Sequence, residues 1–153
     1  MDPGERMAGI DAYTGGYEAI MAAVEGLTPA QLDRHPDGEW SVRQIIHHLA
    51  DTEAFRVTRL RRLLTEDSAM ILWFDEGEMA RSLHYERPPE VSLSLFEAAV
   101  RSNLELIALM SEADWQRSGV HSEFGAFTMD DWLQRAVDHL PAHAEQIRAT
   151  LAS

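Results

Sequence analysis

The feature that most constrains the fold is the stretch from Trp40 to Leu64, WSVRQIIHHLADTEAFRVTRLRRLL. Its apolar residues recur every three or four positions, so they share one face of a single helix. Ser41 stands just before the first turn, where a helix N-cap residue belongs. The residues expected on the apolar face are Val42, Ile45, Ile46, Leu49, Leu60, Leu63 and Leu64. A long helix with such a face needs other elements to cover it.

Three further stretches have the same helical periodicity. The first covers residues 4–25, where the expected inward face holds Met7, Ile10, Tyr17, Met21 and Val24. The other two begin with the S/T-x-x-D/E pattern of a capping box, at Ser94 and at Thr128. The four helices, with residues 65–91 as a long crossover connection, predict an all-α four-helix bundle and one domain over residues 1–153.

The connections contain shorter features. The crossover is expected to hold one short helix near residues 75–83, and residues 115–127 are expected to form a loop or a small hairpin. No convincing strand pattern occurs elsewhere. Gly15 and Gly16 interrupt the first helix, and because glycine weakens a helix by about 1 kcal/mol relative to alanine, they indicate close packing against another helix.

Composition excludes several classes of protein. The net charge is −13, from 13 basic and 26 acidic residues, which argues against a nucleic-acid partner. No apolar run approaches the ~20 residues of a membrane span, and the start of the chain lacks a signal-peptide pattern, so we expect a cytoplasmic protein without a membrane partner. The absence of cysteine excludes disulfides and cysteine-ligated metals.

The histidines suggest a metal site. His139 and His143 are spaced i,i+4 on the last helix, which lets both imidazoles reach one ion. His48 lies at the edge of the apolar face of the Trp40–Leu64 helix, where it could supply a third ligand, whereas His47 is expected to point toward solvent. Three imidazoles leave a coordination position open and suit zinc, nickel, iron(II) or copper. A hydrogen-bonded core histidine is the structural alternative for each ring.

Other charged residues on the same helix have two interpretations. Glu53 and Arg56 fall on the apolar face and either form a structural ion pair or line a polar cavity beside His48. Arg56, Arg59, Arg61 and Arg62 together are expected to form a solvated helix face. Pro141 lies between His139 and His143, where an interior proline removes a backbone hydrogen bond and indicates local reshaping.

The run WSVRQIIHHLADTE, the segment LLTEDSAMILWFDEGEMA and the late DHLPAHAEQI resemble the DinB superfamily, and in particular its YfiT-like branch of metal-dependent hydrolases. That branch includes bacillithiol transferases. The resemblance covers most of the chain, and its specific parts are the W-S-x-R-x-x-x-H-H-x-A-D and H-x-x-x-H patterns. It implies a four-helix bundle, a homodimer, and a divalent metal ion (nickel, zinc, iron or manganese) bound by His48, His139 and His143. Pro141 departs from the expected pattern.

Two functions follow from this resemblance. In the first, the metal activates a low-molecular-weight thiol cosubstrate or a water for reaction with a small-molecule substrate, as in a thiol S-transferase or a hydrolase. Asp51 and Glu53 are candidates for the base, and no catalytic residue is assigned. In the second, the chain is a non-catalytic, stress-associated bundle with a structural metal or a small-ligand pocket. A fourth protein ligand to the metal would favour the second function, and an open position would favour the first.

Overall fold

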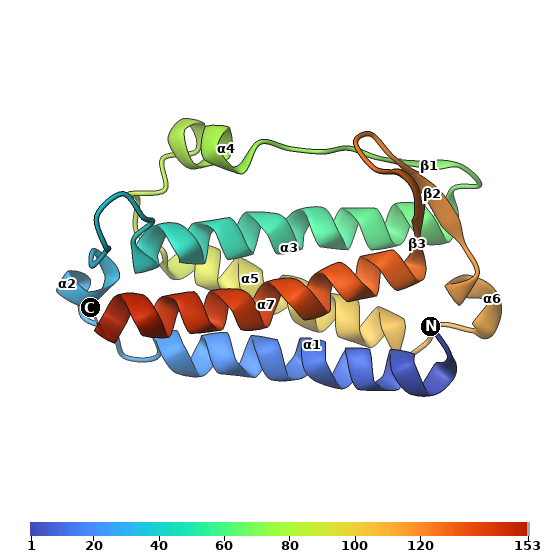
Figure 1. Cartoon of the computed structure of the whole chain (residues 1–153), viewed down its shortest axis with the longest axis horizontal. Helices are drawn as coiled ribbons and strands as arrows, with labels where there is room; N and C mark the ends of the chain where they lie inside the picture. The colour runs from blue at the N-terminus through green and yellow to red at the C-terminus, as the bar shows by residue number, and fades with distance from the viewer. Residues whose placement is uncertain (153) are drawn as a thin grey trace.

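The computed structural model describes residues 1–152 and shows a four-helix bundle (Figure 1). The four long helices are α1 (Pro3–Val24), α3 (Val42–Thr65), α5 (Glu90–Ile107) and α7 (Met129–Ala152). Helix α7 packs along both α1 and α3, and α3 packs along α5, whereas α1 and α5 make little contact. Helices α3 and α7 lie side by side and run in opposite directions, so the start of α3 faces the end of α7.

Two of the three predicted helix starts are confirmed. Ser41 caps α3 within a capping box. Thr28 caps the short helix α2 (Pro29–Leu32) in the same way. Thr128 and Asp131 exchange the same pair of hydrogen bonds at the start of α7. The prediction for Ser94 was wrong, because α5 already begins at Glu90, after Pro89. Proline suits the start of a helix, and Ser94 lies inside it, where its hydroxyl donates to the Glu90 carbonyl.

The inward face of α1 differs in part from the prediction. Val24 is buried, and Ile10, Tyr17 and Met21 pack partly buried against the core as predicted. Met7, however, is 61% exposed, and Tyr13, Gly16 and Ile20 are the buried residues at the centre of this face. The face is rotated because polar groups on α1 have buried partners: the Tyr13 hydroxyl donates to Glu53 over 2.6 Å. Apolar periodicity cannot reveal an inward face that is anchored by a tyrosine hydroxyl.

A small sheet closes one end of the bundle. It consists of β1 (Ala69–Ile71), β2 (Ser118–His121) and β3 (Gly125–Thr128), with β1 parallel to β2 and β2 antiparallel to β3. The hairpin β2–β3 is the small hairpin that the sequence left open for residues 115–127. β1 was not predicted. Two further short helices are α4 (Glu76–Ser82), as expected within the crossover, and α6 (Glu112–Trp115).

A buried ionic network holds α1, α3 and α5 together. The carboxylate of Glu53 is fully buried and accepts hydrogen bonds from Arg56, over 2.8 Å, and from Tyr13. The Asn103 amide contacts the same Tyr13 hydroxyl over 3.3 Å. Glu53 and Arg56 therefore form the structural ion pair predicted as one of two alternatives. Within residues 1–152, no helix is long and apolar enough to cross a membrane.

Candidate metal centre

Three imidazole rings meet between α3 and α7. Nε2 of His139 lies 3.0 Å from Nε2 of His48 and 3.2 Å from Nε2 of His143. One ligand atom from each of the three rings lies within 4.8 Å of the others. His48 comes from the second turn of α3, and His139 and His143 come from successive turns of α7. The antiparallel packing of these two helices brings the rings together across 91 positions of sequence.

The hydrogen bonds around these rings place one nitrogen lone pair toward the cluster and leave the contacts between the rings unsatisfied. Nδ1 of His143 lies 2.7 Å from Oε1 of Gln146, and because that oxygen can only accept, Nδ1 carries the proton and Nε2 keeps its lone pair. Nε2 of His139 faces both other rings, but one ring nitrogen has either one proton or one lone pair and cannot satisfy both neighbours. Nδ1 of His139 is buried without a hydrogen-bond partner.

A metal ion fits this arrangement better than hydrogen bonds do. A tetrahedral ion with metal–nitrogen distances of ~2.0–2.1 Å holds its ligand nitrogens ~3.3 Å apart, close to the 3.0 and 3.2 Å that separate Nε2 of His139 from the other two rings. No other His, Cys, Asp or Glu among residues 1–152 joins the group, so none of these residue types would fill a fourth position on the ion. The donor set, three neutral nitrogens, suits a divalent transition metal.

The surroundings keep the rings neutral. Burial lowers the pKa of His48 to about 3 and that of His139 to about 2, and the neighbouring His143 and Arg56 act in the same direction. Burial also lowers the pKa of His143, against the opposing effect of its hydrogen bond to Gln146. A neutral imidazole is the form that binds a metal ion, so these rings are ready to bind at neutral pH.

His47, expected in solvent, is fully buried. Its Nε2 lies 2.9 Å from the Arg87 carbonyl, its Nδ1 lies 2.7 Å from the Ser92 hydroxyl, and its ring stacks on Tyr85. The prediction failed because the end of the crossover folds over the side of α3 opposite to the metal-site rings. Both ring nitrogens have partners, so His47 is not available as a ligand.

Pro141 does not break α7, which continues through it to Ala152. The proline lies on the side of α7 that packs against Gly16 of α1, where a β-carbon on the glycine would lie 3.1 Å from the Pro141 Cδ. Gly16 thus has the close packing that the sequence predicted, whereas Gly15 faces open space. The two metal-site histidines of α7 project from its other side, toward α3.

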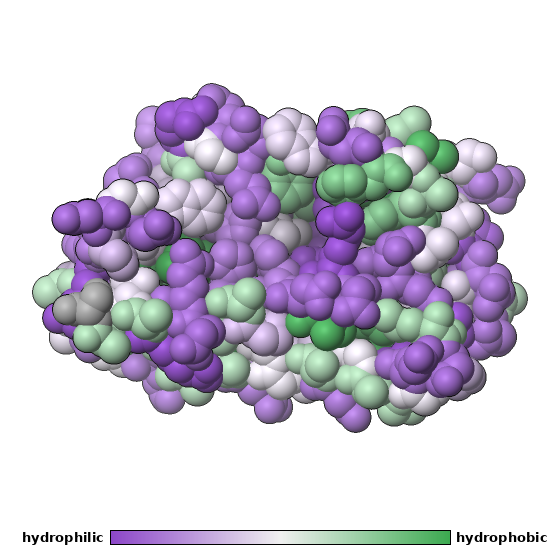
Figure 2. Space-filling view, viewed as in Figure 1, coloured by the Kyte–Doolittle hydropathy of each residue, from purple (hydrophilic) through white to green (hydrophobic). Residues whose placement is uncertain are grey.

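A pocket of about 360 Å³ opens beside the three rings. His139 and His143 line it together with residues from α3, α4, α7 and the connection that precedes α4; these are Thr52, Arg56, Arg59, Phe74, Glu76, Arg135, Asp138 and Ala142. The face in Figure 2 shows hydrophilic residues gathered along the middle, between α3 and α7. The pocket gives a small molecule access to the histidine cluster.

The candidate bases named from the sequence do not line this pocket. Glu53 accepts its hydrogen bonds within the buried network, and Asp51 accepts a hydrogen bond from the Tyr85 hydroxyl over 2.8 Å. Glu76, at the start of α4, lines the pocket instead, and burial together with Asp75 raises its pKa. Sequence reasoning missed Glu76 because its segment has no period and no partner at a fixed spacing.

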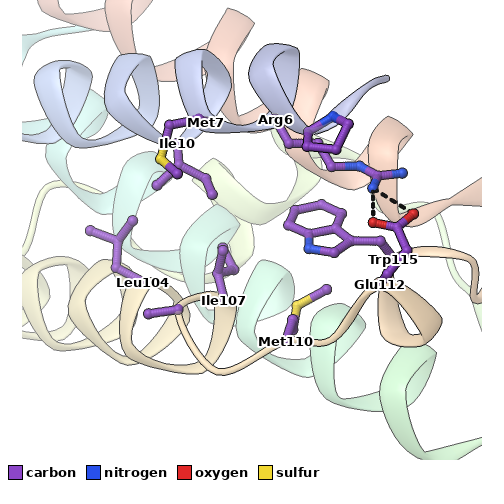
Figure 3. Close-up of a pocket in the computed structure, with 10 residues that line it drawn as sticks. Arg6, Met7, Ile10, Leu104, Ile107, Met110, Glu112 and Trp115 are labelled. Atoms are coloured by element: carbon purple, nitrogen blue, oxygen red, sulfur yellow. Dashed lines mark hydrogen bonds and ion pairs between the residues drawn. The ribbon is translucent and has the colours of Figure 1, made fainter.

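A larger cavity, about 450 Å³, lies between α1, α5 and α6. Figure 3 shows its mostly apolar wall, with Met7 and Ile10 on one side and Leu104 and Ile107 on the other. The Arg6 guanidinium at its edge is already paired with Glu112 over 2.9 Å. No group of metal-ligating side chains in residues 1–152 falls in this cavity, so the chemistry is expected at the smaller pocket.

Comparison with known proteins finds a family model and relatives whose names refer to a metal. A family model described as DinB superfamily matches residues 12–147. A protein of Oceanobacillus iheyensis named "Putative metal-dependent hydrolase OB0782" is 38% identical over 67% of this chain and 60% of its own length. A Geobacillus thermodenitrificans protein named "Putative metal-dependent hydrolase" is 40% identical over 65% of this chain and 57% of its own length. The chain thus matches less than two thirds of either relative.

Two solved structures share the fold. YfiT from Bacillus subtilis, described as a probable metal-dependent hydrolase with an unusual four-helix bundle topology, superposes with a TM-score of 0.85 at 25% identity, over 99% of this chain and 90% of YfiT. TT2238, a four-helix bundle protein, superposes with a TM-score of 0.66 at 23% identity, over 94% of this chain and 98% of TT2238.

Proposed function

The chain belongs to the DinB superfamily, and we propose that it is a metal-dependent enzyme in which His48, His139 and His143 hold one divalent transition metal ion. The observation that carries the proposal is the meeting of the three Nε2 atoms at the side of an open pocket. A protein whose metal is only structural closes the coordination shell with its own side chains. The absence of a fourth candidate ligand in the described part of the chain therefore favours an enzyme.

The reaction we propose is attack by water or a small thiol on an electrophilic small molecule. A divalent metal bound to three imidazoles lowers the pKa of a water or thiol in the open position. The protein contributes the neutral rings, the hydrogen bond from His143 to Gln146 that orients one of them, and a pocket that admits the substrate. Glu76 is the pocket carboxylate proposed to accept a proton, since its raised pKa brings it closer to neutral pH.

Metal analysis of the purified protein tests the site. The wild type is expected to bind close to one equivalent of nickel, zinc, iron or manganese, measured by mass spectrometry after equilibration with each metal. His48→Ala, His139→Ala and His143→Ala are expected to lose most of that metal. His35→Ala is the matched control, because His35 is exposed in a loop away from the site. Equal metal content in all five proteins would overturn the proposal.

A second assay separates the two reactions. The metal-loaded protein is mixed with monochlorobimane and a low-molecular-weight thiol, and with an activated ester in the absence of thiol. Thiol conjugation that depends on His48 identifies a transferase, and ester hydrolysis that depends on the same residue identifies a hydrolase. If neither rate exceeds that of the His48→Ala protein although the metal is bound, the enzyme proposal is wrong and the non-catalytic alternative stands.

A further inference from the structure

Two arginines in the metal-site pocket lack a carboxylate partner. Arg59 of α3 and Arg135 of α7 both line the pocket with His139 and His143, and neither forms an ion pair within residues 1–152. Arg56, the third arginine, is instead paired with Glu53 over 2.8 Å. In a chain with twice as many acidic as basic residues, this pocket therefore holds two guanidinium groups that no carboxylate of the described residues pairs with.

A backbone carbonyl and aromatic rings contact the two guanidinium groups, and none of these contacts neutralises their charge. Arg59 donates one hydrogen bond to the Leu72 carbonyl over 2.6 Å, and its guanidinium lies 5.2 Å from the centre of the Phe74 ring. The Arg135 guanidinium lies 4.4 Å from the centre of the Phe124 ring and 5.8 Å from that of Phe127. Aromatic faces attract a cation but leave its N–H donors free, so both groups remain able to bind an anion.

The electrostatic repulsion between the two guanidinium groups also favours binding of an anion. Burial, with Arg56 and Arg135 adding to it, lowers the pKa of Arg59 to about 10. The guanidinium of Arg59 is therefore partly desolvated among like charges. The two pocket carboxylates do not relieve this repulsion: Asp138 accepts a hydrogen bond from Gln134, and Glu76 makes no ion pair with either arginine among the described residues. An anion bound between the arginines would relieve it.

We propose that Arg59 and Arg135 bind an anionic group of the substrate, a carboxylate or a phosphate, beside the metal centre. This proposal rests on the proposed function and adds the class of substrate. Arg135 and His139 are four residues apart on α7, a rise of about 6 Å along the helix axis. The anionic group of the substrate therefore lies several bonds from the atom that reacts.

The test measures binding rather than turnover. Benzoate and phenyl phosphate are titrated calorimetrically into metal-free and metal-loaded protein at low ionic strength, with benzyl alcohol as the neutral comparison. The wild type is expected to bind at least one of the two anions and to bind benzyl alcohol much more weakly. Arg59→Gln and Arg135→Gln are each expected to weaken anion binding about tenfold or more. Arg148→Gln, on an exposed arginine of the same helix α7, is the matched control and is expected to bind like the wild type.

The outcomes separate the two proposals. Anion binding that both arginine variants lose while metal content is unchanged supports the anion site. Anion binding equal in wild type and both variants, or absent from the wild type, overturns the anion site even if the metal is bound. If the metal-free protein binds the anions through the arginines but takes up no metal, the anion site stands and the proposed function fails. Because Arg135 is exposed, Arg135→Gln is expected to fold even if Arg59→Gln does not.

Discussion

A β-carbon added to Gly16 would lie 2.8 Å from the Cβ of Leu140, closer than two such carbons can approach. Helices α1 and α7 therefore touch backbone to backbone next to His139. The neighbouring Gly15 has nothing within 4 Å of the same position. The two adjacent glycines thus differ in what they do: one permits the contact that supports the histidine helix, and the other faces open space.

Replacing each glycine by alanine is expected to have opposite effects. Gly15→Ala should raise the free energy of unfolding by about 0.5–1 kcal/mol, because alanine is the better helix former. Gly16→Ala should lower it by about 1–3 kcal/mol, because α1 must shift away from α7. Urea denaturation monitored by circular dichroism measures both. Equal effects of the two substitutions would show that the close contact is not present.

Replacing Gln146 by leucine should weaken metal binding without removing it. The hydrogen bond from the His143 Nδ1–H to Oε1 of Gln146 keeps the other ring nitrogen unprotonated and fixes the ring. Loss of such a partner typically lowers metal affinity by about 10–100-fold. Competition with a chromogenic chelator measures the change. Gln116→Leu, at an exposed glutamine that contacts Glu112, is the control, and an unchanged affinity in Gln146→Leu would contradict the prediction.

Alanine substitutions of the adjacent His47 and His48 should have different effects. His48→Ala is expected to lose the metal, whereas His47→Ala should keep the metal and lose stability. His47 is buried and its ring nitrogens face the Arg87 carbonyl and the Ser92 hydroxyl, so its removal leaves a cavity and two unsatisfied groups, at about 2–4 kcal/mol. Metal analysis and thermal unfolding on the same two proteins measure the two effects. Metal loss in His47→Ala at full stability would contradict the assignment.

The metal-free protein should become less stable as the pH falls below about 6.5. The folded-state pKa of His48 is about 3 and that of His139 about 2, both below the ordinary value of 6.5. Below pH 6.5 the unfolded chain takes up protons that the folded chain does not, so stability is complete above that pH and is lost as the pH drops toward the folded values. The expected slope is at most about 1.4 kcal/mol per pH unit for each ring.

Urea denaturation at pH 7.5, 6.5 and 5.5 in the presence of a chelator measures this slope. The double variant His48→Leu, His139→Leu removes both rings and should show a shallower dependence on pH. His35→Leu, at an exposed loop residue outside the histidine cluster, is the control for replacing a histidine by leucine. A slope in the wild type no steeper than in the double variant would contradict the prediction.

Breaking the buried ion pair should be costly. Arg56→Met leaves the fully buried Glu53 carboxylate without its cation, which typically costs about 3–5 kcal/mol. Arg101→Met breaks the exposed pair with Glu97 and should change stability by less than about 1 kcal/mol. Chemical denaturation of the two variants gives the comparison directly. Similar small losses would indicate that Glu53 is held mainly by Tyr13.

The sequence determined the helices and the candidate ligands, because both follow from the spacing of residues along the chain. Apolar residues at intervals of three and four, together with capping residues such as Ser41 and Thr128, define α3 and α7. The i,i+4 spacing of His139 and His143 places them on one face of a helix wherever the helix packs. Likewise, the paired glycines in α1 signalled a close contact, although not which of the two makes it.

Only the tertiary structure decided which residues far apart in the sequence come into contact. The burial of His47 depends on residues 85–92 folding over α3, and β1 forms only because residues 69–71 pair with a strand 50 positions later. Glu76, Arg59 and Arg135 share a pocket because α3, α4 and α7 pack together, and no spacing within the sequence indicates it. The physical reason is that a local pattern fixes the direction of a side chain on its own helix, whereas its neighbours across the bundle are chosen by packing.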